Sequence, residues 1–293
     1  MPSARAFLRP EAPIHSGVMG DPAWELAHEA ALGAGVSLRP LPDLDDADRI
    51  LEVMIATWGE HQLLPREMIH ALGASGNMPW GAFDGQEMIG YVLGWAGIDP
   101  EEGLHAHSHM LATLPDRRHH GVGYALKLAQ RAQALGQGIR LVRWTFDPLV
   151  ARNAYFNLWK LGAVADRFHR NFYGEMTDSL NRGERSDRFV VRWDLVRTPG
   201  PRNVAVIDAA PVLERSGDAD APIPVLLESP PGGAVLVQIP REYGDLRERD
   251  PELGRAWRDA LAEALEECLK AGLVAAGFDG PTGAYVMAED PGP

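Results

Sequence analysis

The sequence has little of what an extracellular, membrane-spanning or nucleic-acid-binding protein needs. One cysteine, Cys268, stands among 293 residues, which excludes an intrachain disulfide framework and favours a reducing compartment. Acidic residues outnumber lysine and arginine by 41 to 28, and a formal net charge of -13 argues against nucleic acid or an anionic membrane as a partner. No apolar run approaches the roughly 20 residues of a membrane span, and the first residues lack the apolar core of a signal peptide. We therefore expect a cytoplasmic protein that holds any acidic ligand with local arginine clusters.

The hydrophobic pattern predicts helices and strands along most of the chain. Residues 1–35 are expected to form an irregular arm and a short helix, which Asp21 and Pro22 begin. Asp84-Gly85 is typical of a hairpin turn, and Gly162 is typical of a helix end. From 36 onwards we expect a strand at 36–41, helices at 43–58 and 65–72, strands at 79–83, 88–97 and 104–114, a helix at 122–135, a strand at 140–146, a helix at 152–161, and strands at 168–174 and 189–196.

A glycine loop, Arg118-His119-His120-Gly121-Val122-Gly123, joins the strand at 104–114 to the next helix. The first N–H groups of a helix lack partners and carry partial positive charge, so anions bind there. The two glycines let the backbone come close to phosphate oxygens, and the arginine adds a charged donor. We interpret the loop as a pyrophosphate site. An ordinary glycine-rich turn is the alternative, because the string alone is a weak signal.

Four further runs add to this pattern: His107-Ser108-His109-Met110, Trp144-Thr145-Phe146-Asp147-Pro148-Leu149, Asn153-Ala154-Tyr155-Phe156-Asn157-Leu158 and Ser186-Asp187-Arg188. Together with the element order and the glycine loop, they make residues 36–196 resemble the GNAT superfamily of acyl-CoA-dependent N-acyltransferases. More narrowly, the four runs are similar to a bacterial subgroup with a C-terminal extension that is often associated with N-acylamino-acid racemases, some of whose members resemble amino-acid N-succinyltransferases.

This resemblance implies a fold and an activity. The fold is α/β (α+β), with a mixed, mostly antiparallel central sheet. The activity is transfer of a succinyl or acetyl group from acyl-CoA to the amine of a small acceptor, such as an amino acid, by direct attack in a ternary complex. No metal is expected.

The resemblance also implies contacts with the acyl-CoA co-substrate. In the superfamily the strand before the loop pairs with the pantetheine arm, and the loop amides hold the pyrophosphate. Asn153, on the next helix, is the nearest candidate for a pantetheine or thiol contact, although its register is one or two residues off the common pattern. The expected contacts are Leu111, Ala112, Thr113, Arg118, His119, His120, Gly121, Val122, Gly123, Tyr124 and Asn153.

The attacking amine must lose a proton, and histidine is suited to accept it near neutral pH. Alternation along the strand at 104–114 places His105, His107 and His109 on one face. By resemblance, His107 falls where several GNAT enzymes carry a catalytic glutamate, so it is the first candidate for the base and His109 the second. The row could instead bind zinc or be structural. Zinc is disfavoured by the absence of H-E-x-x-H or C-x-x-C partners.

The position of the general acid departs from the family pattern. Many GNAT enzymes have a tyrosine in the helix after the fifth strand, and that position here is Leu158. Tyr155 lies one turn earlier and could replace it, or could be a core aromatic. A thiolate leaves readily near neutral pH, since thiol pKa values lie around 8.5. The reaction could therefore proceed without an acid.

An amino-acid acceptor needs a cation for its carboxylate, and arginine is the usual partner. The candidates in or beside the four runs are Arg143, Arg152, Arg170 and Arg188, with Asp147 to orient the amine. Arg143 and Arg170 could instead be solvated strand charges, and Asp147 could simply begin a turn before Pro148.

Thr-Pro-Gly-Pro within 197–202 marks a boundary, so residues 36–196 and 203–293 are expected to form separate units. The second should be a small α+β unit with strands at 204–207, 224–227, 234–239, 273–278 and 284–288 and a helix at 251–270. It has no second glycine loop, so we expect it to support the acceptor pocket or a homodimer interface and not to bind a second CoA. A catalytically silent acyl-CoA-binding sensor is the alternative function, favoured by Leu158. A metal-dependent hydrolase ranks third.

Overall fold

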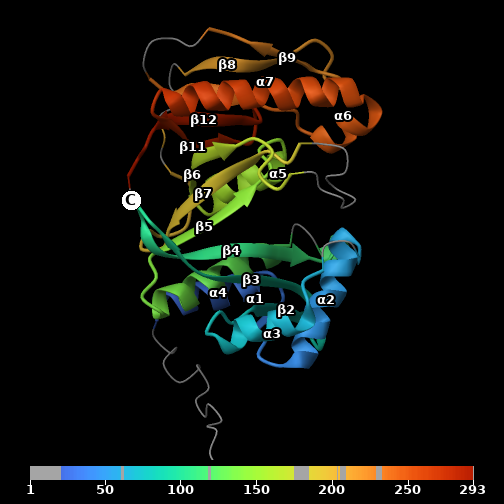
Figure 1. The fold of residues 1–293 in the computed structure, drawn as a ribbon, viewed down its shortest axis with the longest axis vertical. Coiled ribbons are helices and arrows are strands. Elements are labelled where there is room, and N and C mark those ends of the chain that lie inside the picture. The colour runs from blue at the N-terminus through green and yellow to red at the C-terminus, as the bar shows by residue number, and fades with distance from the viewer. Residues whose placement is uncertain are drawn as a thin grey trace, which may run out of the picture.

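One mixed sheet of twelve strands runs through the computed structural model, which describes residues 21–60, 63–117, 120–174, 185–202, 204, 209–228 and 233–292 (Figure 1). The strand order is β1-β2-β3-β4-β5-β7-β6-β11-β12-β10-β8-β9. The strands are β1 (Ser37–Pro40), β2 (Trp80–Asp84), β3 (Glu87–Asp99), β4 (Gly103–Thr113), β5 (Leu141–Phe146), β6 (Val164–His169), β7 (Arg188–Asp194), β8 (Ala210–Ser216), β9 (Ile223–Leu226), β10 (Val235–Gln238), β11 (Leu273–Asp279) and β12 (Ala284–Glu289).

The helices cover both faces of this sheet. They are α1 (Pro22–Gly33), α2 (Leu44–Trp58), α3 (Arg66–Ala74), the 3-10 turn η2 (Pro115–Arg117), α4 (Val122–Gly136), α5 (Ala151–Ala154), the π-helical turn η3 (Tyr155–Lys160), α6 (Tyr243–Arg249) and α7 (Pro251–Lys270). None of those described is long and apolar enough to cross a bilayer.

The predicted fold class and the order of elements up to β7 are confirmed. The Asp84-Gly85 turn joins β2 to β3, and Gly85 has the positive φ of 59° that such a turn requires. One strand was misplaced, and two elements were missed. The strand predicted at 168–174 lies at Val164–His169, and β8 and α6 were not foreseen. Most of the strand expected at 204–207 lies outside the described residues.

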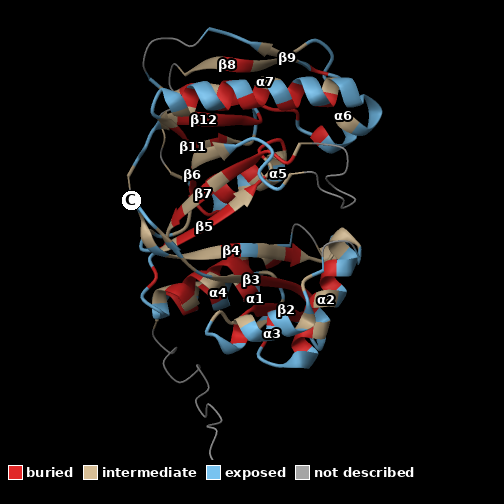
Figure 2. Cartoon of the chain, viewed as in Figure 1, coloured by how far each residue is buried: buried red, intermediate tan, exposed pale blue. Residues whose placement is uncertain are grey.

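Two layers of helix pack on opposite faces of β2 and β3 (Figure 2). On one face α1 and α4 pack together, and Trp24 and Leu126 share a core with Trp80. On the other face α2 and α3 bury Ile50 and Ile69 against the same strands. Because α1 covers the outer side of α4, that helix is buried around most of its surface.

The strands β4 and β5 diverge, and this divergence organises the rest of the molecule. They pair in parallel at only two positions, Ala106 with Val142 and His107 with Arg143 (Figure 1). On its other side β4 stays paired with β3, but the register skips one residue: Leu93 faces Met110 and Gly94 faces Ser108. His109 is thus the extra residue of a β-bulge, placed just where β4 leaves β5.

Gly94 sets the close approach of β3 to this bulge. A Cβ there would lie 2.2 Å from the carbonyl oxygen of His107 and 3.0 Å from the Cα of Ser108. We expect Gly94→Ala to displace β4 and to lower the free energy of unfolding by about 1–3 kcal/mol. Urea denaturation measures this. Gly136→Ala is the matched control, since a Cβ at Gly136 meets nothing within 4 Å. Equal stability of the two variants would contradict the expectation.

The residues after β7 extend the same sheet. β11 lies beside β6, and β12, β10, β8 and β9 follow, with α7 packed along them (Figure 1). Asp250 caps α7 by accepting hydrogen bonds from the N–H groups of Glu252 and Leu253. Trp257 and Leu265 of α7 join the same core as Trp144 and Phe189. The extension therefore packs directly against β5 and β7.

Candidate active site

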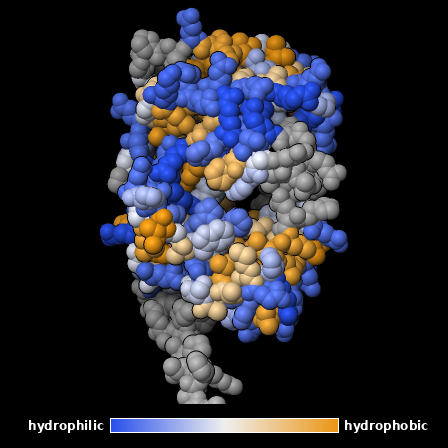
Figure 3. Space-filling model, viewed as in Figure 1, coloured by the Kyte–Doolittle hydropathy of each residue, from blue (hydrophilic) through white to orange (hydrophobic). Residues whose placement is uncertain are grey.

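The free edge of β4 is the first feature of the site. Beyond His107, no described strand pairs with β4 on the β5 side, so backbone groups of Ser108 to Thr113 face an opening inside the sheet. The predicted contact residues Leu111, Ala112 and Thr113 lie on this stretch. Figure 3 shows the surface hollowed where β4 and α5 lie apart. An extended ligand can pair with a free strand edge of this kind, as an added strand does.

The N-terminus of α4 lies at the far end of that edge. Gly121 is its N-cap with φ of 87°, and Val122 is the first helical residue. A Cβ on Gly123 would lie 3.7 Å from Leu111 Cδ2, 4.0 Å from Thr113 Oγ1 and 4.0 Å from the ring of Phe156. The helix start, β4 and the helix after β5 thus meet at Gly123. This arrangement has the donors that an anion at the end of an extended ligand requires.

The other predicted loop residues are distributed around this helix start. His120 is exposed and lines a pocket of about 320 Å³ with Val122 and Arg117. Tyr124 is half-buried at the first turn of α4, and burial raises the pKa of its hydroxyl. Asn153 is half-buried in α5. Arg118 and His119 lie outside the described residues.

The histidine row lies on the strand where the opening begins. The rings of His107 and His109 lie 4.9 and 4.7 Å from that of Trp95, and 5.8 Å from each other. The Nδ1 of His105 lies 3.3 Å from the carbonyl oxygen of Gly103. Both rings at 107 and 109 pack against the Trp95 indole. Within the described ranges no group of three or more His, Cys, Asp or Glu residues could hold a metal ion.

Burial keeps the imidazole of His107 neutral. It lowers the pKa of His107 to about 4, with further lowering by the charges of His109, His105 and Lys127. Burial also lowers the pKa of His109. Near neutral pH His107 therefore has a free lone pair that can accept a proton, and it lies beside the point where the two strands part.

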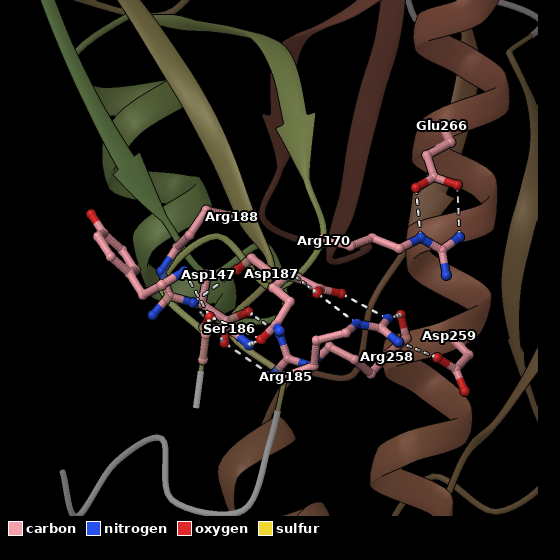
Figure 4. Close-up of polar contacts among 12 residues, drawn as sticks. Asp147, Arg170, Arg185, Ser186, Asp187, Arg188, Arg258, Asp259 and Glu266 are labelled. Atoms are coloured by element: carbon pink, nitrogen blue, oxygen red, sulfur yellow. Dashed lines mark hydrogen bonds and ion pairs between the residues drawn. The ribbon is translucent and has the colours of Figure 1, made fainter. Parts of the chain in front are cut away.

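Among the residues predicted to bind the acceptor, Arg143 and Arg170 are paired within the protein. The guanidinium of Arg143 is buried and donates hydrogen bonds to Glu102 and, at 2.9 and 3.1 Å, to Asp166. Arg170 donates to Glu266 at 2.6 and 2.7 Å (Figure 4). Arg152 is exposed on α5.

Asp147, at the end of β5, is held by the C-terminal extension. Its carboxylate accepts hydrogen bonds from Arg258 of α7 at 2.8 and 3.0 Å (Figure 4). It also accepts one at 2.9 Å from the N–H of Leu149, the arrangement of a side-chain turn. Arg188 is buried with its nearest guanidinium nitrogen 4.0 Å from Asp147, and its guanidinium carbon lies 5.4 Å from the ring centre of Tyr173. The structure thus brings Asp147 and Arg188 together, and places Arg170 on the outer side of the same cluster.

The helix after β5 carries no tyrosine hydroxyl at the usual position. Leu158 is fully buried in the core. The ring of Tyr155 stacks on Trp159 at 6.3 Å and lies 3.3 Å from where a Cβ on Gly280 would be, so it packs against the turn between β11 and β12. Phe156 instead reaches the start of α4, and Asn157 accepts a hydrogen bond from the Trp144 indole at 3.2 Å.

Comparison with known proteins gives one family. Residues 46–162 match the profile of the Acetyltransferase (GNAT) family. This part of the chain is a GNAT acetyltransferase domain. The prediction of an acyltransferase is confirmed at that level, and the narrower bacterial subgroup is not shown. No curated protein matches the chain.

Three solved structures illustrate the similarity of fold. Naa20 of Chaetomium thermophilum, in complex with a bisubstrate analogue, is 17% identical with a TM-score of 0.46, over 57% of this chain and 93% of its own. The ribosomal-protein-S18-alanine N-acetyltransferase of Escherichia coli is 14% identical with a TM-score of 0.44, over 58% and 99%. NAA60 of Arabidopsis thaliana, also with a bisubstrate analogue, is 18% identical with a TM-score of 0.44, over 54% and 98%. Similarities this distant say nothing about the acceptor of this chain.

Sequence reasoning missed two residues at the base of the opening, Ser108 as a functional group and Lys127. Lys127 lies on α4, the helix predicted at 122–135, and its amine is fully buried. Burial lowers the pKa of this amine to about 7. The signal available was a lysine directly between Leu126 and Leu128, because a helix covered on two sides leaves such a residue no route to water.

Proposed function

We propose that this chain is an acyl-CoA-dependent N-acyltransferase that acylates the amine of a small acceptor, in first place an amino acid. The observation that carries the proposal is the opening of β4 from β5 beyond His107, with the N-terminus of α4 at the end of the open edge. The family match of residues 46–162 supports it independently.

The residues suggest how the reaction proceeds. The edge of β4 from Ser108 to Thr113 pairs with the extended arm of the co-substrate, and the first amides of α4 hold its pyrophosphate. The acceptor amine then attacks the thioester carbon directly. The neutral imidazole of His107, directly or through water, takes the proton that the nitrogen loses. The new C–N bond replaces the C–S bond, and the electron pair leaves with sulfur.

We base the proposed acceptor and donor on the subgroup resemblance and on the charged residues at the end of β5. Arg188 lies by Asp147 at the end of β5, on the side of the sheet where Thr145 hydrogen-bonds Tyr173 at 3.0 Å. A guanidinium next to exposed aromatic rings suits the carboxylate and side chain of an amino acid. A succinyl donor fits the same resemblance. The extension from 203 to 293 supports this end of the domain through Arg258, and a homodimer is a further proposal for it.

Thiol release tests the proposal. Acetyl-CoA and succinyl-CoA are supplied in parallel, with a panel of D- and L-amino acids and no added metal, and acyl-CoA binding is measured by calorimetry. We expect turnover with succinyl-CoA and apolar or aromatic amino acids. Binding of acyl-CoA without turnover on any amine would support the alternative, a silent acyl-CoA sensor, which Leu158 in the tyrosine position favours.

A further inference from the structure

The departing thiolate needs a proton, and the expected donor is missing from the helix after β5. Leu158 has no exchangeable proton, and the Tyr155 ring packs on Gly280 of the extension. The strand side of the opening offers another group. The first residue of β4 beyond its last pairing with β5 is Ser108, and the next residue of β5 is Trp144.

The side chain of Lys127, on α4, contacts both of these residues. Its Nζ donates hydrogen bonds to Ser108 Oγ at 2.8 Å and to Gln130 Oε1 at 3.0 Å, and lies 3.9 Å from the ring centre of Trp144. Among the described residues no carboxylate lies within ion-pair distance of it. An ammonium held by two neutral acceptors and an indole face is costly to bury, so this amine gives up its proton more readily than a surface lysine.

The choice of lysine is itself informative. The chain uses arginine nearly everywhere, and its lysines are Lys127, Lys160 and Lys270. Lys160 and Lys270 are exposed, whereas Lys127 is buried at the junction of the strands. A buried arginine stays charged, whereas the pKa of a lysine shifts readily when it is buried. Of the two basic residues, only lysine can therefore both hold and release a proton at this position.

We propose that Ser108 is the proton donor to the departing CoA thiolate and that Lys127 resupplies it. As the C–S bond breaks, the Ser108 hydroxyl passes its proton to sulfur, and an Nζ–H of Lys127 passes a proton to Ser108 Oγ. After CoA has left, water in the opening protonates Ser108 Oγ as the hydroxyl proton of Ser108 passes back to the neutral Lys127 amine. Ser108 acts on the substrate, and Lys127 is a positioning residue that acts through it. This inference rests on the proposed acyl transfer.

The environment of the Lys127 amine sets the pH range in which the proton relay works. The groups packed on its amine are Ser108 of β4, Gln130 of α4, Trp144 of β5 and, at 5.7 Å, Trp193 of β7. The titratable neighbour that feels its charge is His107, whose pKa it lowers. Because burial lowers the pKa of Lys127 to about 7, its proton is available below that pH in the free protein.

Substitutions at both positions test the relay. Lys127→Met removes a buried charge from an apolar site, so we expect Tm to rise while kcat falls about tenfold or more. Ser108→Ala should lower kcat similarly, and Ser108→Thr should restore it. All three should bind acyl-CoA within about threefold of the wild type. The alkaline limb of the wild-type pH–kcat profile should be absent in Lys127→Met. Lys160→Met is the matched control.

A second readout needs no turnover. With ¹³C-labelled lysine, the NMR signal lost in Lys127→Met should titrate near pH 7 in the free protein, and those of Lys160 and Lys270 well above it. Wild-type turnover with kcat unchanged in Lys127→Met and Ser108→Ala would overturn the relay and leave the proposed function standing. Loss of acyl-CoA affinity in step with kcat would also overturn it. Absence of wild-type turnover would overturn the proposed function instead.

Discussion

His107→Ala lowers kcat by about 10²- to 10⁴-fold and leaves the Kd for acyl-CoA within about threefold. The reason is that His107 lies on β4 at its last pairing with β5, and takes no part in the open edge or in the start of α4. Loss of a positioned base removes a contribution of this size from the chemical step. Steady-state kinetics and calorimetry on the same preparation measure the two effects.

His105→Asn is the matched control, because His105 shares the strand and the face but its ring lies over Gly97. Its kcat should stay within about threefold of the wild type. If both variants lost activity equally, the histidine row would be a structural element, as its packing on Trp95 also allows. If neither did, the amine would lose its proton to water.

The buried state of His107 also fixes the pH dependence. Its pKa of about 4 lies below the ordinary value near 6.5, so the base is neutral throughout the working range. We expect kcat/KM for the acceptor to fall at low pH with the protonation of the acceptor amine, and the midpoint to move with that amine's pKa. A limb fixed near pH 6.5 for every acceptor, and lost in His107→Gln, would contradict this.

The lowered pKa of His107 also makes the free energy of unfolding depend on pH. Between pH 6.5 and about 4 the unfolded chain binds a proton on His107 and the folded chain does not, so the free energy of unfolding falls as the pH falls through that window. In His107→Gln that part of the fall should disappear.

Local signals accounted for much of the fold. The Asp84-Gly85 turn, the glycine loop and the Asp250-Pro251 start of α7 each work within a few residues, so the sequence was enough to place them. The bulge at His109 and the divergence of β4 from β5 depend on contacts between distant strands. Neither was predicted, and the residue at which the strands part, His107, came from the structure.

The candidate site was harder to predict because charge pairing is not local. Arg143 looked like a ligand for a carboxylate, yet Glu102 and Asp166, distant in sequence, enclose it. Lys127 was not singled out from the sequence, because the groups around its amine come from β4, β5 and β7, and two of those strands follow α4 in the chain. Residue type and hydrophobic periodicity indicate which side chains are candidates for catalysis or binding. Which of them are already paired is decided by strand order.

Arg258→Met lowers the free energy of unfolding by about 3–5 kcal/mol, although the residue lies outside the matched family region. The side chains of Arg258 and Asp147 are 5% and 13% exposed, so the variant leaves a nearly buried carboxylate with its remaining partners at Leu149 and, at 4.0 Å, Arg188. Asp147→Asn should cost a comparable amount, because it leaves the guanidinium buried. Urea denaturation of both, and of the double variant, measures their coupling.

The Arg170–Glu266 pair supplies the control within the same cluster. Its side chains are 39% and 46% exposed, so Glu266→Gln should cost about 0–1 kcal/mol.

Since Asp147 ends β5 beside Arg188, we also expect Arg258→Met to raise KM for the acceptor more than KM for acyl-CoA. A single urea transition that shifts as a whole would show that the extension and the GNAT domain unfold together. A loss near 0–1 kcal/mol for Arg258→Met would mean that the extension packs on β5 without holding Asp147, and the acceptor end of the site would then be stabilised by the apolar core shared by Trp257 and Phe189.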